Sequence, residues 1–161
     1  MTIAIGDKLP TGTFRVMTSD GPAPKTTDEI FSGKKVVLFA VPGAFTPTCH
    51  RNHLPGFLSH LDQMAEKGVD AVAVTAVNDV FVMDAWAKSS GGDGKIMFLS
   101  DGNADFARAL GLEMDASGGG LGVRSRRYAM IVDDGVVSWF AVEEAPGKVD
   151  QASADSVFAA L

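Results

Sequence analysis

The sequence predicts an α/β fold in which a mixed central β-sheet is flanked by helices on both faces. Apolar runs rich in β-branched residues, typical of buried strands, alternate with segments whose apolar residues recur at helical spacing. The last two apolar runs are joined by Asp133-Asp134-Gly135, a strong hairpin signal, so antiparallel strands close the sheet. With 161 residues, 46% of them hydrophobic, the chain suits a single domain over residues 1–161 that can bury a core.

Five apolar runs are expected to form the strands. The run from Lys35 to Val41 is almost continuously apolar and ends at Pro42-Gly43, as a buried central strand does. Residues 1–25 carry several Gly and Pro, and they predict a loose arm or a hairpin around Thr13 to Ser19. Asp115 to Gly122 is expected to be a Gly-rich loop. The expected strands are 35–41, 69–77, 95–99, 128–132 and 136–142.

Helices are expected before, between and after these strands. Apolar residues recur at helical spacing from Leu54 to Ala65, and Lys67-Gly68 is a common helix end. Pro55 lies near the start of this helix and should kink it or delay it. Asp79 and Ser153 are suited to cap the starts of two others. The remaining helical segments are 27–31, 79–88, 104–110 and 153–161.

The charge balance and the cysteine count limit the classes of function. The formal net charge is -6, and a surface for nucleic acid or anionic lipid would need an excess of Lys and Arg. The N-terminus lacks a signal-peptide pattern, and no apolar run has the length of a membrane span. A single cysteine excludes an internal disulfide and fits a reducing compartment. We therefore expect a cytoplasmic protein that binds neither nucleic acid nor membrane.

Cys49 is the residue most suited to chemistry. It lies where the buried strand passes into a helix, and unpaired N–H groups and the helix dipole favour a negative charge there. The thiolate form should therefore be favoured, and the thiolate is the nucleophilic form of cysteine. Thr46, three residues earlier, can accept a hydrogen bond and donate one in turn. The stretch Arg124-Ser125-Arg126-Arg127 could supply a fixed positive charge.

Other interpretations of these residues stay open. A lone cysteine is often a small buried hydrophobe, although the prolines and threonines around this one indicate a turn. Cys49 with His50, His53 and His60 could suggest a metal, but a zinc site needs about four converging ligands. His53, four residues after Cys49, could act as the base of a cysteine protease or another acyl transferase, although no third group is evident. A redox sensor that reacts once is the remaining alternative.

The segment around Cys49 resembles a known family. Pro42, Thr46 and Cys49 match the pattern P-x-x-x-T-x-x-C, the peroxidatic motif of the peroxiredoxin superfamily. The longer string PGAFTPTC, followed by HLPGF from His53, resembles the type II or peroxiredoxin-5 subfamily. The similarity covers roughly Ile5 to Leu161. Further matches are Val77-Asn78-Asp79, Phe81-Val82, Trp86 and Leu121 to Tyr128.

This resemblance implies a thioredoxin-like fold and a thiol-dependent peroxidase that reduces hydrogen peroxide and alkyl hydroperoxides. Cys49 would attack the peroxide and become a sulfenic acid, and Thr46 would hydrogen-bond the peroxide. Pro42 would shield the sulfur from water, and Arg127 matches the active-site arginine of the family. The resemblance also implies no metal, no organic cofactor and a homodimer that packs near the active-site loops. The candidates to line the peroxide pocket, for which packing is an equally good interpretation, are Phe45 and Leu121.

The sequence departs from many relatives in lacking a second cysteine. In those relatives it resolves the sulfenic acid from near the strand before Asn78 or from the loop before the last helix. The corresponding segments here, Val72 to Val77 and Gly147 to Ala152, contain no cysteine. The sulfenic acid would therefore be reduced by an external thiol, either glutathione with a glutaredoxin or thioredoxin.

Overall fold

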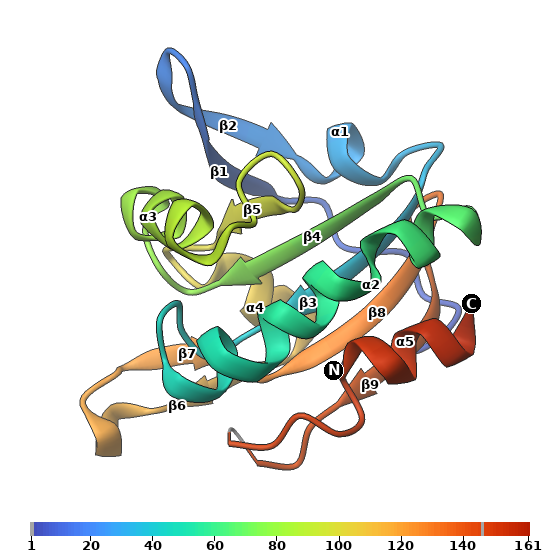
Figure 1. Ribbon diagram of the computed structural model, residues 1–161. Helices are drawn as coiled ribbons and strands as arrows, with labels where there is room; N and C mark the ends of the chain where they lie inside the picture. Colours follow the sequence, from blue (N-terminus) through green and yellow to red (C-terminus); the bar gives the residue numbers. More distant parts are fainter. Residues whose placement is uncertain (1, 146) are drawn as a thin grey trace.

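The computed structural model describes residues 2–145 and 147–161. The strands of its main sheet are β1 (Thr13–Thr18), β2 (Gly21–Thr26), β3 (Lys35–Ala40), β4 (Ala71–Ala76), β5 (Met97–Ser100), β8 (Tyr128–Asp133) and β9 (Val136–Val142). They form a seven-stranded sheet in the order β2-β1-β5-β4-β3-β8-β9 (Figure 1). The pairs β3–β4 and β4–β5 are parallel, whereas the pairs toward both edges are antiparallel. The sheet is therefore mixed, as the sequence predicts.

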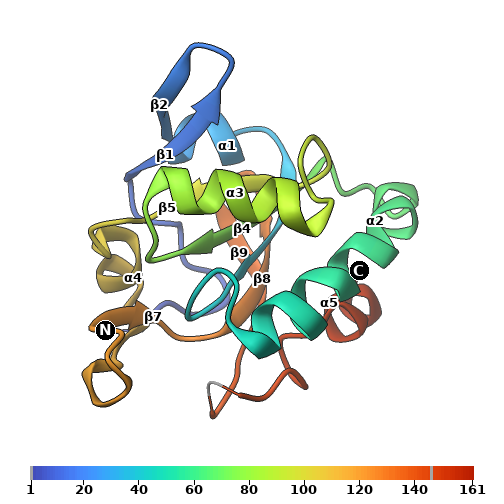
Figure 2. The same cartoon turned by 60° about the vertical axis from the view of Figure 1, so that its left-hand side comes forward.

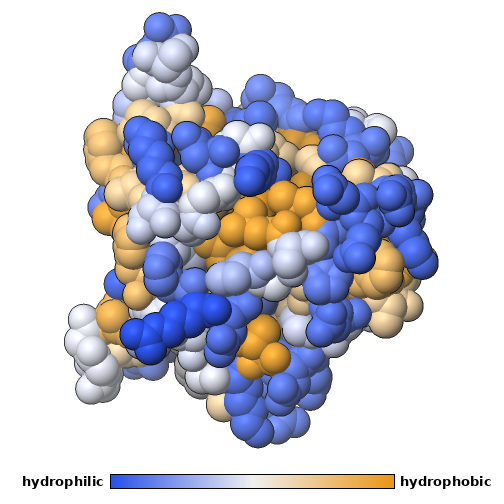
Figure 3. Space-filling model, in the orientation of Figure 1, coloured by the Kyte–Doolittle hydropathy of each residue, from blue (hydrophilic) through white to orange (hydrophobic). Residues whose placement is uncertain are grey.

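Helices cover both faces of this sheet. The α-helices of the described residues are α1 (Thr27–Phe31), α2 (Leu54–Glu66), α3 (Val80–Ser90), α4 (Asp105–Leu110) and α5 (Ala154–Ala160). A short 3₁₀-helix spans Ser117–Gly119. Buried residues of α2, α3 and α5 share one core, and those of α1 and α4 share the core on the other face (Figures 1 and 2). Figure 3 shows a strip of hydrophobic surface between α2 and α3. Within the described residues, no helix is long and apolar enough to cross a membrane.

β3 separates the two cores. Val37 and Phe39 point to the face covered by α2, and Val36 and Leu38 point to the opposite face. All four side chains are 0% exposed. A central strand that is buried on both faces has no polar position, which explains the continuous apolar run in the sequence. The chain therefore leaves the carboxyl end of β3 inside the protein, where the candidate site begins.

Most of the expected elements are present, but a small second sheet was not predicted. The expected hairpin between β8 and β9 is confirmed, with Asp134 and Gly135 in the left-handed region that its tight turn needs. Residues 13–26 form the hairpin of β1 and β2. Where we expected only a Gly-rich loop, β6 (Glu113–Asp115) and β7 (Val123–Ser125) pair around it. Strands of three residues are too short for an alternating pattern to reveal them.

Candidate active site

The segment that carries Cys49 passes from β3 into α2 through a π-helical turn, Cys49–His53. In this turn the N–H of Leu54 donates to the carbonyl of Cys49, five residues earlier. An α-helical bond from position 55 to Arg51 is not available, because Pro55 has no N–H and its ring crowds that carbonyl. The sequence predicted that Pro55 would kink the helix or delay its start, and a π-helical turn precedes α2 at this point. Such turns are frequent at functional sites. Cys49 is at the start of this helical segment.

Arg127 donates a hydrogen bond to the sulfur of Cys49. The distance from Nη2 to Sγ is 2.8 Å. Cys49 is 0% exposed and Arg127 is 2% exposed. The pairing of Ala40 with Tyr128 in neighbouring strands brings the residue before β8 beside the residues after β3. Because a guanidinium is always charged, this contact places a fixed positive charge and a hydrogen-bond donor beside the sulfur, at the start of a helical segment.

His53 connects Arg127 to the segment before α5. Its Nδ1 lies 2.8 Å from Nη1 of Arg127, and its Nε2 lies 2.7 Å from the carbonyl oxygen of Ala152. Arginine can only donate and a carbonyl can only accept, so these partners assign the neutral tautomer with the proton on Nε2. Burial and, secondarily, the charge of Arg127 lower the pKa of His53 from 6.5 to about 3. The ring is therefore neutral at physiological pH and holds the guanidinium by accepting from it.

The two other arginines of the basic stretch contact backbone carbonyls elsewhere. Nη2 of Arg126 donates to the carbonyl of Glu143 at 3.2 Å. Arg124 donates through Nε to the carbonyl of Leu121 at 2.9 Å, and through Nη1 to that of the buried Pro42 at 3.3 Å. Arg124 thus joins the loop between β6 and β7 to the loop after β3, whereas Arg127 alone of the three contacts the sulfur in the described hydrogen bonds.

The loop after β3 is held in place by short polar contacts. The hydroxyl of Thr46 donates to the carbonyl of Gly43 at 2.7 Å, so its lone pairs are directed elsewhere and can accept. The amide oxygen of Asn78 accepts from the N–H of Ala44 at 2.9 Å. A Cβ at position 43 would lie only 2.9 Å from Nη1 of Arg124 and 3.1 Å from Cγ2 of Thr46. A side chain at this position would therefore force Arg124 and Thr46 to move away from the loop.

Phe45 and Leu121, the expected lining residues, lie at the surface. Their exposed fractions are 45% and 40%. Phe45 has a φ of 65°, which is rare for a bulky residue and typical of strained functional loops. Its ring centroid lies 5.8 Å from that of His50, whose Nδ1 accepts from the indole N–H of Trp86 at 3.1 Å. Phe45 and Leu121 are thus large apolar side chains on the two loops that Arg124 joins.

Sequence reasoning missed the position of His53 between Arg127 and Ala152. We considered this histidine only as a metal ligand or as a base for Cys49. Its partners are 74 and 99 residues away in sequence, so only tertiary structure reveals them. Over residues 2–145 and 147–161, no group of three or more His, Cys, Asp or Glu side chains is placed to hold a metal ion.

Comparison with known proteins identifies the family. The sequence model of the Redoxin family matches residues 4–158. The rice protein Peroxiredoxin-2E-2, chloroplastic, is 52% identical over 99% of this chain and 73% of its own length. The chain belongs to the peroxiredoxins. It is therefore a peroxidase of the oxidoreductase class that uses a thiol.

Two further comparisons extend over whole chains of this peroxiredoxin's relatives. Peroxiredoxin-2B of Arabidopsis thaliana is 42% identical over 99% of this chain and 98% of its own. The crystal structure of reduced Prx3 from Vibrio vulnificus in complex with hydrogen peroxide is 49% identical, covers 99% of both chains and has a TM-score of 0.93. The fold is thus thioredoxin-like, as the resemblance implied. Because the rice relative is named a chloroplastic protein, the expected cytoplasmic location stays a prediction.

Proposed function

We propose that this peroxiredoxin reduces hydrogen peroxide and alkyl hydroperoxides through a sulfenic acid on Cys49. The observation that carries the proposal is the 2.8 Å hydrogen bond from Arg127 to the sulfur of this fully buried cysteine. A thiol beside a fixed cation, at the start of a helix, has the electropositive environment of a reactive cysteine. The whole unit over residues 1–161 is proposed to act as one domain.

In the first half-reaction the Cys49 thiolate attacks the outer oxygen of the hydroperoxide. An S–O bond forms while the O–O bond breaks, and the electron pair passes to the leaving oxygen. That oxygen takes up a proton and departs as water or an alcohol, so the sulfur is oxidised and the peroxide reduced. Arg127 stabilises the developing negative charge, and the lone pairs of Thr46 accept from the peroxide O–H. Pro42, which is buried at the end of β3, keeps bulk water from the sulfur.

A stopped-flow experiment tests these roles. Reduced protein is mixed with one equivalent of hydrogen peroxide, and sulfenic acid formation is followed with a trapping reagent. Arg127→Ala should slow the reaction by about 100- to 1,000-fold, the usual effect of removing one donor to a developing charge. Arg126→Ala, which removes a side chain that donates to the Glu143 carbonyl and not to the sulfur in the described hydrogen bonds, should react at nearly the rate of the native protein. Cys49→Ser should give no product, and a full rate in Arg127→Ala would refute the assignment.

The second half-reaction is proposed to use an external thiol, because the chain has no second cysteine. The thiolate of glutathione attacks the sulfenic sulfur, an S–S bond forms as the S–O bond breaks, and the leaving hydroxide takes up a proton and departs as water. A mixed disulfide remains on Cys49. A second thiol, from glutaredoxin or from glutathione, then breaks that disulfide, and thioredoxin is the alternative donor. Steady-state turnover with each donor decides between them. Single turnover with every donor would instead favour a redox sensor.

Phe45 and Leu121 are proposed to contact the organic group of alkyl hydroperoxides. Both are large, partly exposed and carried by loops that Arg124 joins beside the Cys49 segment. Leu121→Ala should lower kcat/KM for a bulky aromatic hydroperoxide several-fold and leave kcat/KM for hydrogen peroxide unchanged. Equal effects on both substrates would indicate packing alone.

A homodimer is proposed to form through the same loops. Val123, like Leu121 and Phe45, is a large apolar residue that is at least 40% exposed. Such surface is favourable to bury against a second copy of the chain. Sedimentation should give the mass of a dimer for the native protein and that of a monomer for Val123→Glu. A native monomer at working concentration would refute the proposal.

A further inference from the structure

Glu143 is a buried carboxylate that lies outside the group of side chains in contact with Cys49. It follows β9 directly, and it is 3% exposed. Its Oε1 accepts from the N–H of Asp150 at 2.7 Å and from the N–H of Ala152 at 2.6 Å. A buried charge is unfavourable unless it is hydrogen-bonded, and these two short bonds to backbone N–H groups are of the strong, charge-assisted kind. The carboxylate thereby fixes the segment that precedes α5.

Ala152 connects this carboxylate to the candidate active site. Ala152 is 0% exposed, and its carbonyl accepts from Nε2 of His53 at 2.7 Å. His53 in turn accepts from Arg127, which donates to Cys49, each over 2.8 Å. All five residues from Glu143 to Cys49 are exposed by 3% or less. In a close-packed interior, a shift of Ala152 is passed on to His53 and then to the guanidinium.

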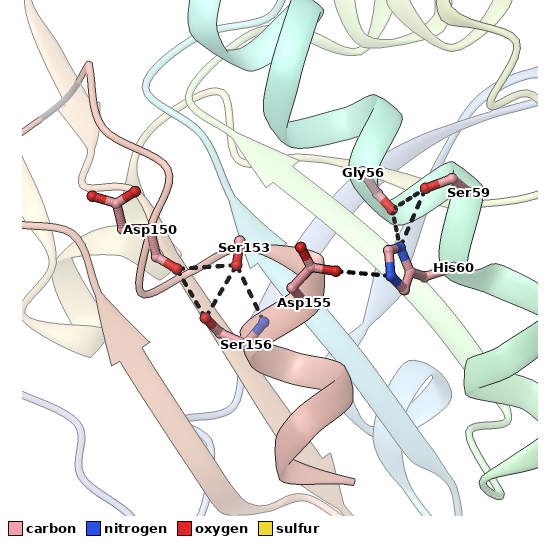
Figure 4. Close-up of polar contacts among 7 residues, drawn as sticks. All are labelled: Gly56, Ser59, His60, Asp150, Ser153, Asp155 and Ser156. Carbon is pink, nitrogen blue, oxygen red and sulfur yellow. Dashed lines mark hydrogen bonds and ion pairs between the residues drawn. The ribbon is translucent and has the colours of Figure 1, made fainter.

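Further polar contacts of this segment lie around the start of α5 (Figure 4). The carbonyl of Asp150 accepts from the hydroxyls of Ser153 and Ser156 at 3.0 and 2.8 Å. His60 of α2 pairs with Asp155 of α5 at 2.9 Å, but the side chain of Asp155 is 87% exposed. Exposed ion pairs of this kind contribute little to stability. They hold the start of α5, whereas Glu143 holds the N–H of Ala152 itself from the buried side.

We propose that Glu143 is a positioning residue of the peroxidase reaction, which fixes Ala152 so that its carbonyl holds His53 in the Nε2–H tautomer and His53 holds Arg127 against Cys49. The inference rests on the proposed roles of Cys49 and Arg127. It requires a side chain of the length of glutamate at position 143, because one oxygen must accept from the N–H groups of both Asp150 and Ala152. The negative charge of the side chain is secondary, because an amide oxygen can accept the same two bonds.

Two conservative variants separate reach from charge. Glu143→Gln keeps the length and an oxygen acceptor, whereas Glu143→Asp keeps the charge and is one methylene too short. We expect Glu143→Asp to react with hydrogen peroxide about 10- to 100-fold more slowly than the native protein, the range found when a supporting hydrogen bond behind a reactive group is lost. Glu143→Gln should stay within about threefold of the native rate. Glu144→Asp, at the exposed neighbouring position, is the matched control and should react at the native rate.

The tautomer of His53 provides a readout that a purely structural role would not change. In ¹⁵N-histidine-labelled reduced protein, the native form and Glu143→Gln should show a neutral Nε2–H ring for His53, and Glu143→Asp should show a mixture of tautomers. Circular dichroism melts first establish a temperature at which every variant is folded. A fast Glu143→Asp with a slow Glu143→Gln would overturn the inference, as would an Nδ1–H ring in the native protein. A full rate in Arg127→Ala would instead remove the proposed role of Arg127, so the two failures are distinguishable.

Discussion

The buried His53 predicts that the reduced protein loses stability when the pH falls below about 6.5. Burial first, and the charge of Arg127 second, lower the pKa of this ring from 6.5 to about 3 in the folded protein. Between these two values the unfolded chain binds a proton that the folded chain does not bind. The titration of this residue therefore has little effect on the free energy of unfolding well above pH 6.5, and it lowers that free energy as the pH falls from 6.5 toward 3.

The size of this loss follows from proton linkage. Going from pH 7 to pH 5 lowers the free energy of unfolding by about 2 kcal/mol through His53 alone. The value depends almost entirely on the pKa of the unfolded chain, because the folded pKa of about 3 lies well below pH 5. Domains of this size have only about 5–15 kcal/mol of stability, so the effect is readily measured.

Urea unfolding at pH 7 and pH 5 provides the measurement. His53→Gln keeps a hydrogen-bond donor and an acceptor but does not titrate. The decrease in its free energy of unfolding between the two pH values should therefore be about 2 kcal/mol smaller than that of the native protein. The subtraction removes the carboxylates that titrate in both proteins. His60→Gln changes a histidine that bridges to the exposed Asp155, and it should retain the His53-dependent loss. Equal losses in the native protein and His53→Gln would refute the reasoning.

Three further predictions concern the loop after β3 and the start of α3. Thr46→Val removes the hydroxyl and its bond to the carbonyl of Gly43; it should lower the rate of reaction with hydrogen peroxide by about 100-fold or more and cost about 1 kcal/mol in urea unfolding. Gly43→Ala places a Cβ 2.9 Å from Arg124 and 3.1 Å from Thr46, so we expect a cost of about 1–3 kcal/mol in urea unfolding and a slower peroxide reaction. Asp79→Ala removes the side-chain bond to the N–H of Val82 at 2.8 Å; it should cost about 1 kcal/mol and leave the peroxide reaction unchanged.

The helices and strands near Cys49 could be predicted because their signals are local. The continuous apolar run of β3 follows from its burial on both faces, and Pro55 indicates a disturbance at the start of α2. The position of Cys49 at a helix start is also a local property. The pair of three-residue strands, β6 and β7, gave no such signal, because three residues are too few for an alternating pattern to be recognised.

The partners of Cys49 could be predicted only in part. The contact with Arg127 was expected from the family resemblance, whereas the spacing of the sequence left three arginines open. The partners of His53 are distant in sequence, and its bond to Ala152 spans 99 residues. The partners of Glu143 lie only seven and nine residues further along the chain, but they are backbone N–H groups of an irregular segment. No periodic pattern around a histidine or a glutamate indicates such contacts, and the positioning roles of both residues stay predictions.

The low pKa of His53 is a requirement of the arrangement around Cys49 rather than a by-product of it. A protonated ring would lose the acceptor for Nη1 of Arg127 and would place a second cation 2.8 Å from the guanidinium. The neutral ring can accept from Arg127 only if its other nitrogen donates, and the carbonyl of Ala152 provides that acceptor at 2.7 Å. Burial therefore has two effects on the same residue: it keeps the ring neutral so that it can hold the arginine, and it makes the fold sensitive to acid. At pH 7 the second effect amounts to only about 0.2 kcal/mol, so under neutral conditions the ring accepts from the arginine with almost no loss of stability from its own titration.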